Sequence, residues 1–199
     1  MAKTIILLEY QNDFLDKAGK WYSLIQSDNN ELFLKKSAQL LNLARQHCLD
    51  IIHVPLVCNH DAHASYGVLD TVFQSGAFKR GTWGQAFIEQ MGPIGNEHVL
   101  QGKSGLSAFS GTDLEAILNK KESRSIIVAG LLTNICIEST IRDAYDRGFD
   151  VTAIEDCMHG TTNEAHCYAT QSTLPSFAKI MSLETVSLSL VTEMTNVSH

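Results

Sequence analysis

Several features that direct a chain to a membrane or to nucleic acid are missing from this sequence. No apolar run approaches the roughly 20 residues that a membrane-spanning helix needs. No basic stripe or arginine cluster occurs, and the formal net charge is −7, so nucleic acid is not an expected partner. The first residues lead straight into an apolar run, without the layout of a signal peptide. We therefore expect a cytoplasmic protein.

The cysteines lack the spacing of a disulfide framework or a structural metal site. The chain has five of them, an odd number, and they form no CxxC pair. In a chain without an export signal, this pattern favours reduced thiols. The cysteines are Cys48, Cys58, Cys136, Cys157 and Cys167.

The order of apolar segments predicts an α/β fold. We find no internal repeat, linker or low-complexity segment, and 199 residues suit one domain spanning 1–199. Continuous apolar runs predict buried strands, and they alternate with segments of helical period. This alternation predicts a three-layer α/β/α domain with a doubly wound, mainly parallel, Rossmann-like sheet. Strands are expected at 4–8, 50–57, 98–100, 126–129, 150–155 and 180–182, and helices at 30–48, 83–91, 112–121, 134–147 and 163–174.

Residues 59–81 have no clear period, and we expect them to be a long loop. Loops of this length in a compact domain are usually functional, often as a wall or lid over a site. Pro55 lies inside the strand before this loop, so that strand should be short there or lie near an edge.

Cys136 stands out because a helix begins around it directly after a buried strand. The strand is 126–129, Gly130 breaks it, and Thr133 and Asn134 are typical helix-starting residues. Unpaired N–H groups at the first turn of a helix favour a thiolate over a thiol, which suits a nucleophile. The alternative is that Cys136 is a small buried hydrophobic residue, the commoner fate of a free cysteine.

The predicted sheet supplies two partners for this thiol. In open parallel sheets, ligands bind outside the carboxyl ends of the strands. Glu9 follows the first strand, Lys103 follows the strand at 98–100, and Cys136 follows the central strand. The fold thus predicts a carboxylate, an ammonium and a thiol at one edge.

Three motifs, in this order, resemble the isochorismatase-like cysteine hydrolases, which include nicotinamidases and N-carbamoylsarcosine amidases. The apolar strand and D-x-Q-x-x-F motif of that family resemble Glu9-Tyr10-Gln11-Asn12-Asp13-Phe14. Its lysine motif resembles Lys103-Ser104-Gly105-Leu106-Ser107-Ala108-Phe109, and its nucleophile motif resembles Gly130-Leu131-Leu132-Thr133-Asn134-Ile135-Cys136. The similarity covers most of the chain.

The resemblance implies a catalytic triad of Glu9, Lys103 and Cys136. Cys136 would attack an amide or similar carbonyl, with the lysine stabilising the thiolate and the carboxylate moving the proton. It further implies an oxyanion hole formed by the backbone N–H groups of Leu132 and Cys136, and a cis peptide between Leu131 and Leu132. Water would then hydrolyse the acyl-enzyme.

The sequence departs from the family at Glu9, where the family has aspartate. The added methylene moves the carboxylate by about 1 Å, and a misplacement of that size can cost on the order of a hundredfold in rate. Asp13 is a second carboxylate nearby, but it matches a non-catalytic family position, and we expect a surface or turn residue there.

Side chains beyond the triad suggest a pocket but no metal centre. By resemblance, Phe14, Trp83 and Phe109 are candidates to line the substrate pocket, although each also suits a core aromatic. His53, His60, Asp61 and His63 resemble metal ligands, but the strand end at 55–58 lacks the Asp-x-His pair of nicotinamidases. We therefore expect no metal and no cofactor.

Three functions remain open. The first is hydrolysis of a small amide or other C–N bond through Cys136. The second is hydrolysis of a vinyl ether, as in isochorismatase itself, which in this family does not need the thiol. The third is a non-catalytic member with an altered acid–base position, supported by Glu9. The resemblance implies a homodimer or homotetramer acting on a small molecule.

Overall fold

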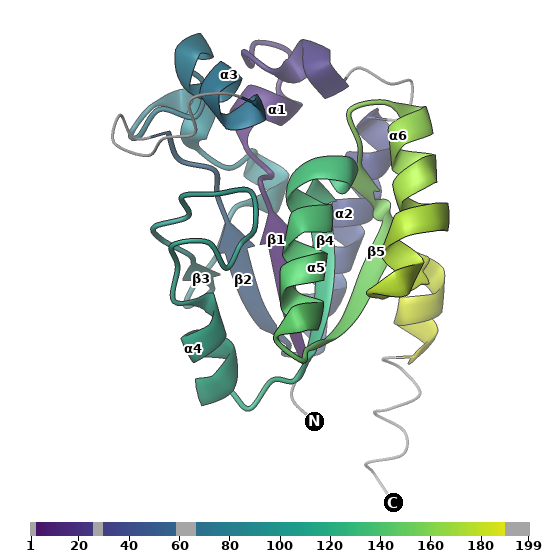
Figure 1. Ribbon diagram of the computed structural model, residues 1–199. Helices are drawn as coiled ribbons and strands as arrows, with labels where there is room; N and C mark the ends of the chain where they lie inside the picture. Colours follow the sequence, from purple (N-terminus) through teal and green to yellow (C-terminus); the bar gives the residue numbers. More distant parts are fainter. Residues whose placement is uncertain (1–2, 26–29, 59–66, 190–199) are drawn as a thin grey trace, which may run out of the picture.

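Six strands form one sheet in the computed structural model, which describes residues 3–25, 30–58 and 67–189 (Figure 1). All the pairings within this sheet are parallel, in the order β3-β2-β1-β4-β5-β6. The predicted α/β fold with a doubly wound parallel sheet is confirmed. The strands are β1 (Lys3–Leu8), β2 (Asp50–Val54), β3 (His98–Val99), β4 (Ser125–Leu131), β5 (Asp150–His159) and β6 (Lys179–Met181).

Helices cover both faces of the sheet (Figure 1). Alternate residues of β1 point to opposite faces, so Ile5 and Leu7 join the core under α2, while Ile6 and Leu8 join the core under α4 and α5. In Figure 1, α1 and α3 lie beyond the carboxyl ends of the strands. The labelled helices are α1 (Asn12–Leu15), α2 (Asn30–Gln46), α3 (Val68–Ser75), α4 (Leu114–Lys120), α5 (Glu138–Asp146) and α6 (Asn163–Tyr168). Residues 183–189 are also helical.

The segments with strong apolar periodicity fold as predicted. The inner face of α2 buries Phe33, Leu40, Leu41 and Ala44, as expected, whereas Cys48 is exposed because the helix ends two residues earlier. β2 ends at Val54, just before its proline, and it is an interior strand between β1 and β3.

Three segments differ from the sequence-based expectation. The expected loop 59–81 contains α3, a helix of eight residues in which only Val72 is buried. Two short 3₁₀ turns, Trp83–Gln85 and Glu89–Met91, replace the helix expected at 83–91. β5 runs on to His159, past Glu155 and Asp156, because its pairing with β4 resumes at Met158 after a register shift between Val128 and Gly130.

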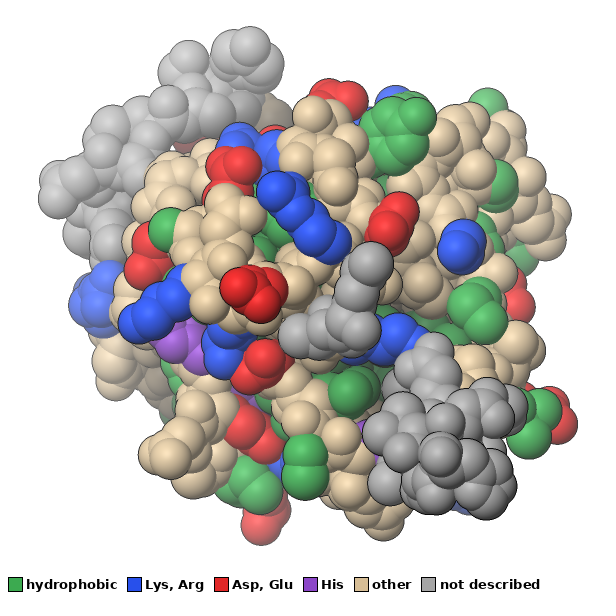
Figure 2. All heavy atoms as spheres, turned by 90° about the horizontal axis from the view of Figure 1, so that it is seen from below, with side chains coloured by type: hydrophobic (Ala, Val, Ile, Leu, Met, Phe, Trp, Pro, Cys, Tyr) green, Lys and Arg blue, Asp and Glu red, His purple; other side chains and the backbone are tan. Residues whose placement is uncertain are grey.

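The surface at the amino ends of the strands carries acidic and basic side chains that are interspersed (Figure 2). A single-sign patch of the kind that binds nucleic acid is not visible on the described part of this face. Among the residues described, no helix combines the length and the apolar character required to cross a bilayer.

Candidate active site

The candidate site lies where β1 and β4 run side by side and the strand order reverses. Leu8 at the end of β1 pairs with Gly130 near the end of β4. The chain moves outward from β1 in one direction and from β4 in the other, and open α/β sheets bind ligands at such a switch point. Glu9 directly follows β1, and Cys136 comes five residues after β4, so both belong to this edge.

Gly130 allows the two strands to approach at this point. Its φ is 128°, a backbone angle that residues other than glycine rarely adopt. A Cβ atom at this position would lie 2.1 Å from the carbonyl oxygen of Leu8. The glycine that interrupts the apolar run is therefore required by the close contact between β1 and β4.

Glu9 is completely buried and has an unusual backbone conformation. Its φ is +61°, in the left-handed region that residues other than glycine seldom occupy, while its N–H donates to the carbonyl oxygen of Val54 at 2.8 Å. Such conformations cost on the order of 1–3 kcal/mol and cluster at functional sites. This backbone conformation directs the Glu9 side chain, which is one methylene longer than the family's aspartate, into the interior of the protein.

Lys103 meets this carboxylate from the segment between β3 and α4. Its Nζ donates to Oε1 of Glu9 at 2.8 Å, and the two side chains are 1% and 0% exposed. Burial disfavours the ammonium, but the charge of Glu9 and its hydrogen bond outweigh that effect and raise the pKa of Lys103. The pair is therefore an ion pair, as the order of motifs predicted. The other oxygen, Oε2, makes no hydrogen bond with the described residues.

Cys136 lies in a π-helical turn, Thr133–Ile137, that leads directly into α5; we call this segment the Cys136 turn. The carbonyl oxygen of Leu132 accepts from the N–H groups of Ile135 and Ile137 at 3.0 and 3.2 Å. The hydroxyl of Thr140 donates to the carbonyl oxygen of Cys136 at 2.7 Å. The predicted strand–turn–helix around the thiol is present, with a wider first turn than an α-helix.

The protonation state of Cys136 differs from the sequence-based expectation. Burial, followed by the charge of Glu9, raises the pKa of the thiol, while Lys103 and the Leu132 backbone lower it. The raising effects win because burial is the largest of them. This direction contradicts the thiolate expected from the sequence and favours a neutral thiol.

The peptide between Leu131 and Leu132 is cis, as the resemblance implied. Leu132 is buried, and its backbone lies close enough to the sulfur of Cys136 to lower the pKa of the thiol. The backbone at Leu132 therefore faces the site, where the resemblance places an oxyanion hole.

The three aromatic pocket candidates are found in three different environments. Phe14 is buried, with its ring 4.6 Å from that of Phe78. Trp83 is 53% exposed and follows the loop beyond α3. Phe109 contacts Phe149 and Arg147, which precede β5 and thus lie at the amino ends of the strands. The structure does not bring the three rings together, and their role in a pocket stays a prediction.

Asp13 is a buried structural carboxylate, which contradicts the expected surface position. Oδ2 accepts from the N–H of Phe78 at 2.6 Å, and Oδ1 accepts from the N–H of Lys20 at 3.1 Å. A Cβ on Gly84 would lie 2.2 Å from the same carboxylate. Asp13 therefore fixes the segment between α3 and the Trp83–Gln85 turn, and its partners are too distant in sequence for a pattern to reveal.

Cys58 and Gln11 also belong to the surroundings of the site. The sequence analysis named Gln11 only within a motif and gave neither residue a role. The Gln11 side chain donates to the carbonyl of Leu56 at 2.8 Å and accepts from its N–H at 2.7 Å, which fixes the chain after β2. Burial and nearby Asp13 raise the pKa of Cys58 to about 11, and its thiol also interacts electrostatically with Lys103. For Cys58, the only signal in the sequence was its position after β2, the strand that pairs with β1.

The described residues contain no group of three or more His, Cys, Asp or Glu side chains that could hold a metal ion. His53 lies in β2, and its Nε2 pairs with Glu97 at 2.8 Å. The other histidine and aspartate candidates, His60, Asp61 and His63, lie outside the described residues.

Comparison with known proteins gives the family. The isochorismatase domain profile matches residues 3–185. The chain belongs to the isochorismatase family. The isochorismatase family protein PncA of Bacillus subtilis (strain 168) is 28% identical over 176 residues, which cover 85% of this chain and 92% of that protein. The suspected resemblance is thus confirmed, and this chain is a hydrolase of that family.

Solved structures share the fold of this isochorismatase-family hydrolase. A cysteine hydrolase from Pseudomonas syringae pv. phaseolicola 1448A superposes with a TM-score of 0.83 at 20% identity, covering 96% of this chain and 92% of that one. Nicotinamidase PncA from Bacillus subtilis superposes with a TM-score of 0.76 at 21% identity, covering 92% of this chain and all of that one. These likenesses bear on the fold alone.

Proposed function

We propose that this chain hydrolyses an amide or other C–N bond of a small molecule, with Cys136 as nucleophile. One observation carries the proposal: the buried Glu9 carboxylate is ion-paired with Lys103 through Oε1, and it lies close enough to Cys136 for its charge to raise the pKa of the thiol. A carboxylate held between an ammonium and a neutral thiol can accept the thiol proton when the sulfur attacks. The isochorismatase family, to which the chain belongs, includes amidases, and this membership supports the choice of reaction.

The first half of the reaction forms a thioester. As the sulfur of Cys136 bonds to the substrate carbonyl carbon, its proton moves to Glu9. The carbonyl oxygen becomes an oxyanion, which the N–H groups of Leu132 and Cys136 stabilise. Glu9 then delivers the proton to the leaving nitrogen, and the C–N bond breaks.

The second half releases the acid. Water attacks the thioester carbon and gives a proton to Glu9, the C–S bond breaks, and the sulfur recovers that proton. Lys103 remains cationic throughout because its pKa is raised, so it offsets the negative charge that develops between Glu9 and the substrate. No cofactor is needed for these steps.

A screen with matched variants tests the proposal. Wild type, Cys136→Ala and Glu9→Gln are assayed with nicotinamide, other small amides, carbamoyl compounds and isochorismate. We expect one class of amide to be hydrolysed by wild type and by the control Cys167→Ala, whose cysteine is exposed, but not by Cys136→Ala or Glu9→Gln.

Two outcomes of this screen would replace the proposal. Turnover of isochorismate that survives in Cys136→Ala would establish the vinyl ether reaction, which needs only Glu9 and Lys103. Absence of any turnover in wild type, with activity appearing in Glu9→Asp, would establish a non-catalytic member that has lost the acid–base geometry of the family.

We further propose that residues 1–199 act as one domain, in the cytoplasm, as a homodimer or homotetramer. The domain profile supports the first point because it extends over 3–185. The mass in solution, measured by light scattering during gel filtration, tests the assembly: a mass near 21.9 kDa would overturn it.

A further inference from the structure

The Cys136 turn is anchored by α6 and by the segment that joins α6 to β5. Thr133 is completely buried, and its hydroxyl lies 2.8 Å from Nδ1 of His166. The next residue, Asn134, accepts from the N–H of Thr161 at 3.0 Å and donates to its hydroxyl at 3.1 Å. Two consecutive residues of the turn are thus held by side-chain hydrogen bonds to residues 161–166.

The fit between these segments is close. A Cβ on Gly160 would lie 3.0 Å from His166 and 3.1 Å from Oδ1 of Asn134, so the chain passes between the two side chains with little space. α6 begins just beyond, where the hydroxyl of Thr162 caps it by accepting from the N–H of Ala165. His166 therefore projects from a capped helix, not from a free loop.

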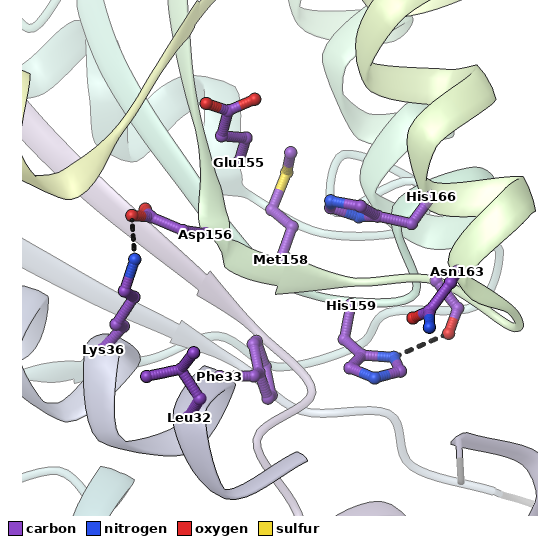
Figure 3. A pocket seen from close by; sticks show the side chains of 10 residues that line it. Leu32, Phe33, Lys36, Glu155, Asp156, Met158, His159, Asn163 and His166 are labelled. Atoms are coloured by element: carbon purple, nitrogen blue, oxygen red, sulfur yellow. Dashed lines mark hydrogen bonds and ion pairs between the residues drawn. The ribbon is translucent and has the colours of Figure 1, made fainter. Parts of the chain in front are cut away.

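The imidazole of His166 is neutral and half-buried. Burial, followed by the neighbouring His159, lowers its pKa. On its other side the ring lines a pocket of about 150 Å³ between α2, β5 and α6, together with His159, Met158 and Phe33 (Figure 3). Removing this ring would enlarge an open pocket and would not create a closed cavity, so the stability cost should be small.

The hydrogen bond between Thr133 and His166 is well placed to fix the position of the Cys136 thiol. Thr133 is the first residue of the Cys136 turn, it follows the oxyanion-facing Leu132, and Cys136 comes three residues later. A shift of this turn by about 1 Å would separate the sulfur from Glu9 and misplace the backbone donors, and displacements of that size can cost on the order of a hundredfold in rate.

We propose that His166 is a positioning residue for Cys136, which acts by holding Thr133 and so fixing the Cys136 turn against Glu9. The proposal rests on the function proposed above, in which Cys136 is the nucleophile. His166 touches neither the reacting atoms nor the substrate in this role. Asn134, the residue after Thr133, makes its own hydrogen bond to Thr161. Among the hydrogen bonds described, only His166 contacts the hydroxyl of Thr133.

The test uses p-nitrophenyl acetate, a small activated ester that does not require knowledge of the natural substrate. The sulfur of Cys136 attacks the ester carbon, the thiol proton passes to Glu9, and p-nitrophenolate leaves, so the burst of colour reports acylation. Cys136→Ala gives the background. We expect His166→Ala and Thr133→Val to lower the acylation rate constant by about ten- to a hundredfold, with KM unchanged.

Conservative variants distinguish a positioning role of His166 from general destabilisation of the protein. Thr133→Ser keeps the hydroxyl and His166→Asn keeps a polar atom near Nδ1, so both should retain acylation within a fewfold of wild type. The double variant Thr133→Val/His166→Ala should be no slower than either single variant, because both remove the same hydrogen bond. His98→Ala, on the exposed strand β3 at the far edge of the sheet, is the matched control.

The results distinguish the two proposals. If wild type shows no acylation above Cys136→Ala, the proposed function is overturned. If wild type acylates and both His166→Ala and Thr133→Val keep its rate constant, only the positioning role is overturned. Equal losses in Thr133→Ser and Thr133→Val would also overturn it, and thermal melting of each variant verifies that the folded protein is being compared.

Discussion

Lys103 and Glu9 form an ion pair of 2.8 Å that is shielded from water on all sides, since their side chains are 1% and 0% exposed. Removing one partner of a buried pair leaves an uncompensated charge in the interior. We expect Lys103→Met to lower the free energy of unfolding by about 3–5 kcal/mol in denaturant titrations.

The pair between Lys121 and Asp50 provides the surface control for this measurement. These side chains are 36% and 37% exposed, and surface pairs contribute about 0–1 kcal/mol. Lys121→Met should therefore cost much less than Lys103→Met. Comparable losses in the two variants would show that the Glu9–Lys103 pair is not desolvated as described.

Glu9→Asp tests whether the backbone has adapted to the longer side chain. The left-handed φ of +61° at Glu9 places a glutamate carboxylate against Lys103 and Cys136. Shortening the side chain withdraws it by about 1 Å, so kcat/KM for the amide substrate should fall on the order of a hundredfold. A variant more active than wild type would indicate that the protein has lost catalysis at this position.

Gly130→Ala should prevent normal folding of the sheet at the site. Its Cβ would lie 2.1 Å from the carbonyl oxygen of Leu8, and one of the two strands would have to move. Gly148 has a φ of 78° with nothing within 4 Å, so Gly148→Ala carries only the conformational cost of about 1–2 kcal/mol. The melting temperatures of the two variants test this prediction. Equal decreases would contradict the close approach between Gly130 and Leu8.

Alkylation of Cys136 by iodoacetamide should rise steadily as the pH is raised. Its thiol pKa is raised by burial and by Glu9, so the thiolate is scarce at neutral pH and still increasing above pH 9. Mass spectrometry follows the Cys136 peptide, with the exposed Cys167 as internal reference. A rate for Cys136 that levels off below pH 8 would instead establish a resting thiolate.

Glu97 should contribute to stability above about pH 4.5 and lose that contribution as the pH falls. Burial disfavours its carboxylate, but hydrogen bonds from Arg45 and His53 prevail and lower its pKa from 4.5 to about 2. A depressed carboxyl pKa means that the unfolded chain binds the proton first. Denaturant titrations should show Glu97→Gln less stable than wild type at pH 7, with the gap narrowing toward pH 3; a constant gap would contradict the coupling.

The strands, and the edge of the sheet at which Glu9, Lys103 and Cys136 lie, were predictable because both depend on local sequence. Apolar runs such as 4–8 and 126–129 are buried wherever they pack, and parallel strands place the residues that follow them at one edge. The Glu9–Lys103 contact followed from that rule together with the family resemblance.

The features that were not predicted depend on partners distant in sequence. Asp13 has ordinary neighbours in the chain, and only Phe78 and Gly84 make it a buried anchor. The pKa of the Cys136 thiol depends on its burial and on the opposing charges of Glu9 and Lys103, which the sequence spacing does not determine. The link between Thr133 and His166 crosses 33 residues and joins two helices that the sequence showed only separately.

The strand order has a consequence for the chain as a whole. Glu9 and Lys103 are 94 positions apart, and Cys136 joins them only when β4 is inserted beside β1. No contiguous fragment that omits either half of the sheet contains a complete set of reacting groups. Turnover is therefore a reporter of complete assembly, and a partly folded or truncated chain should be silent instead of weakly active.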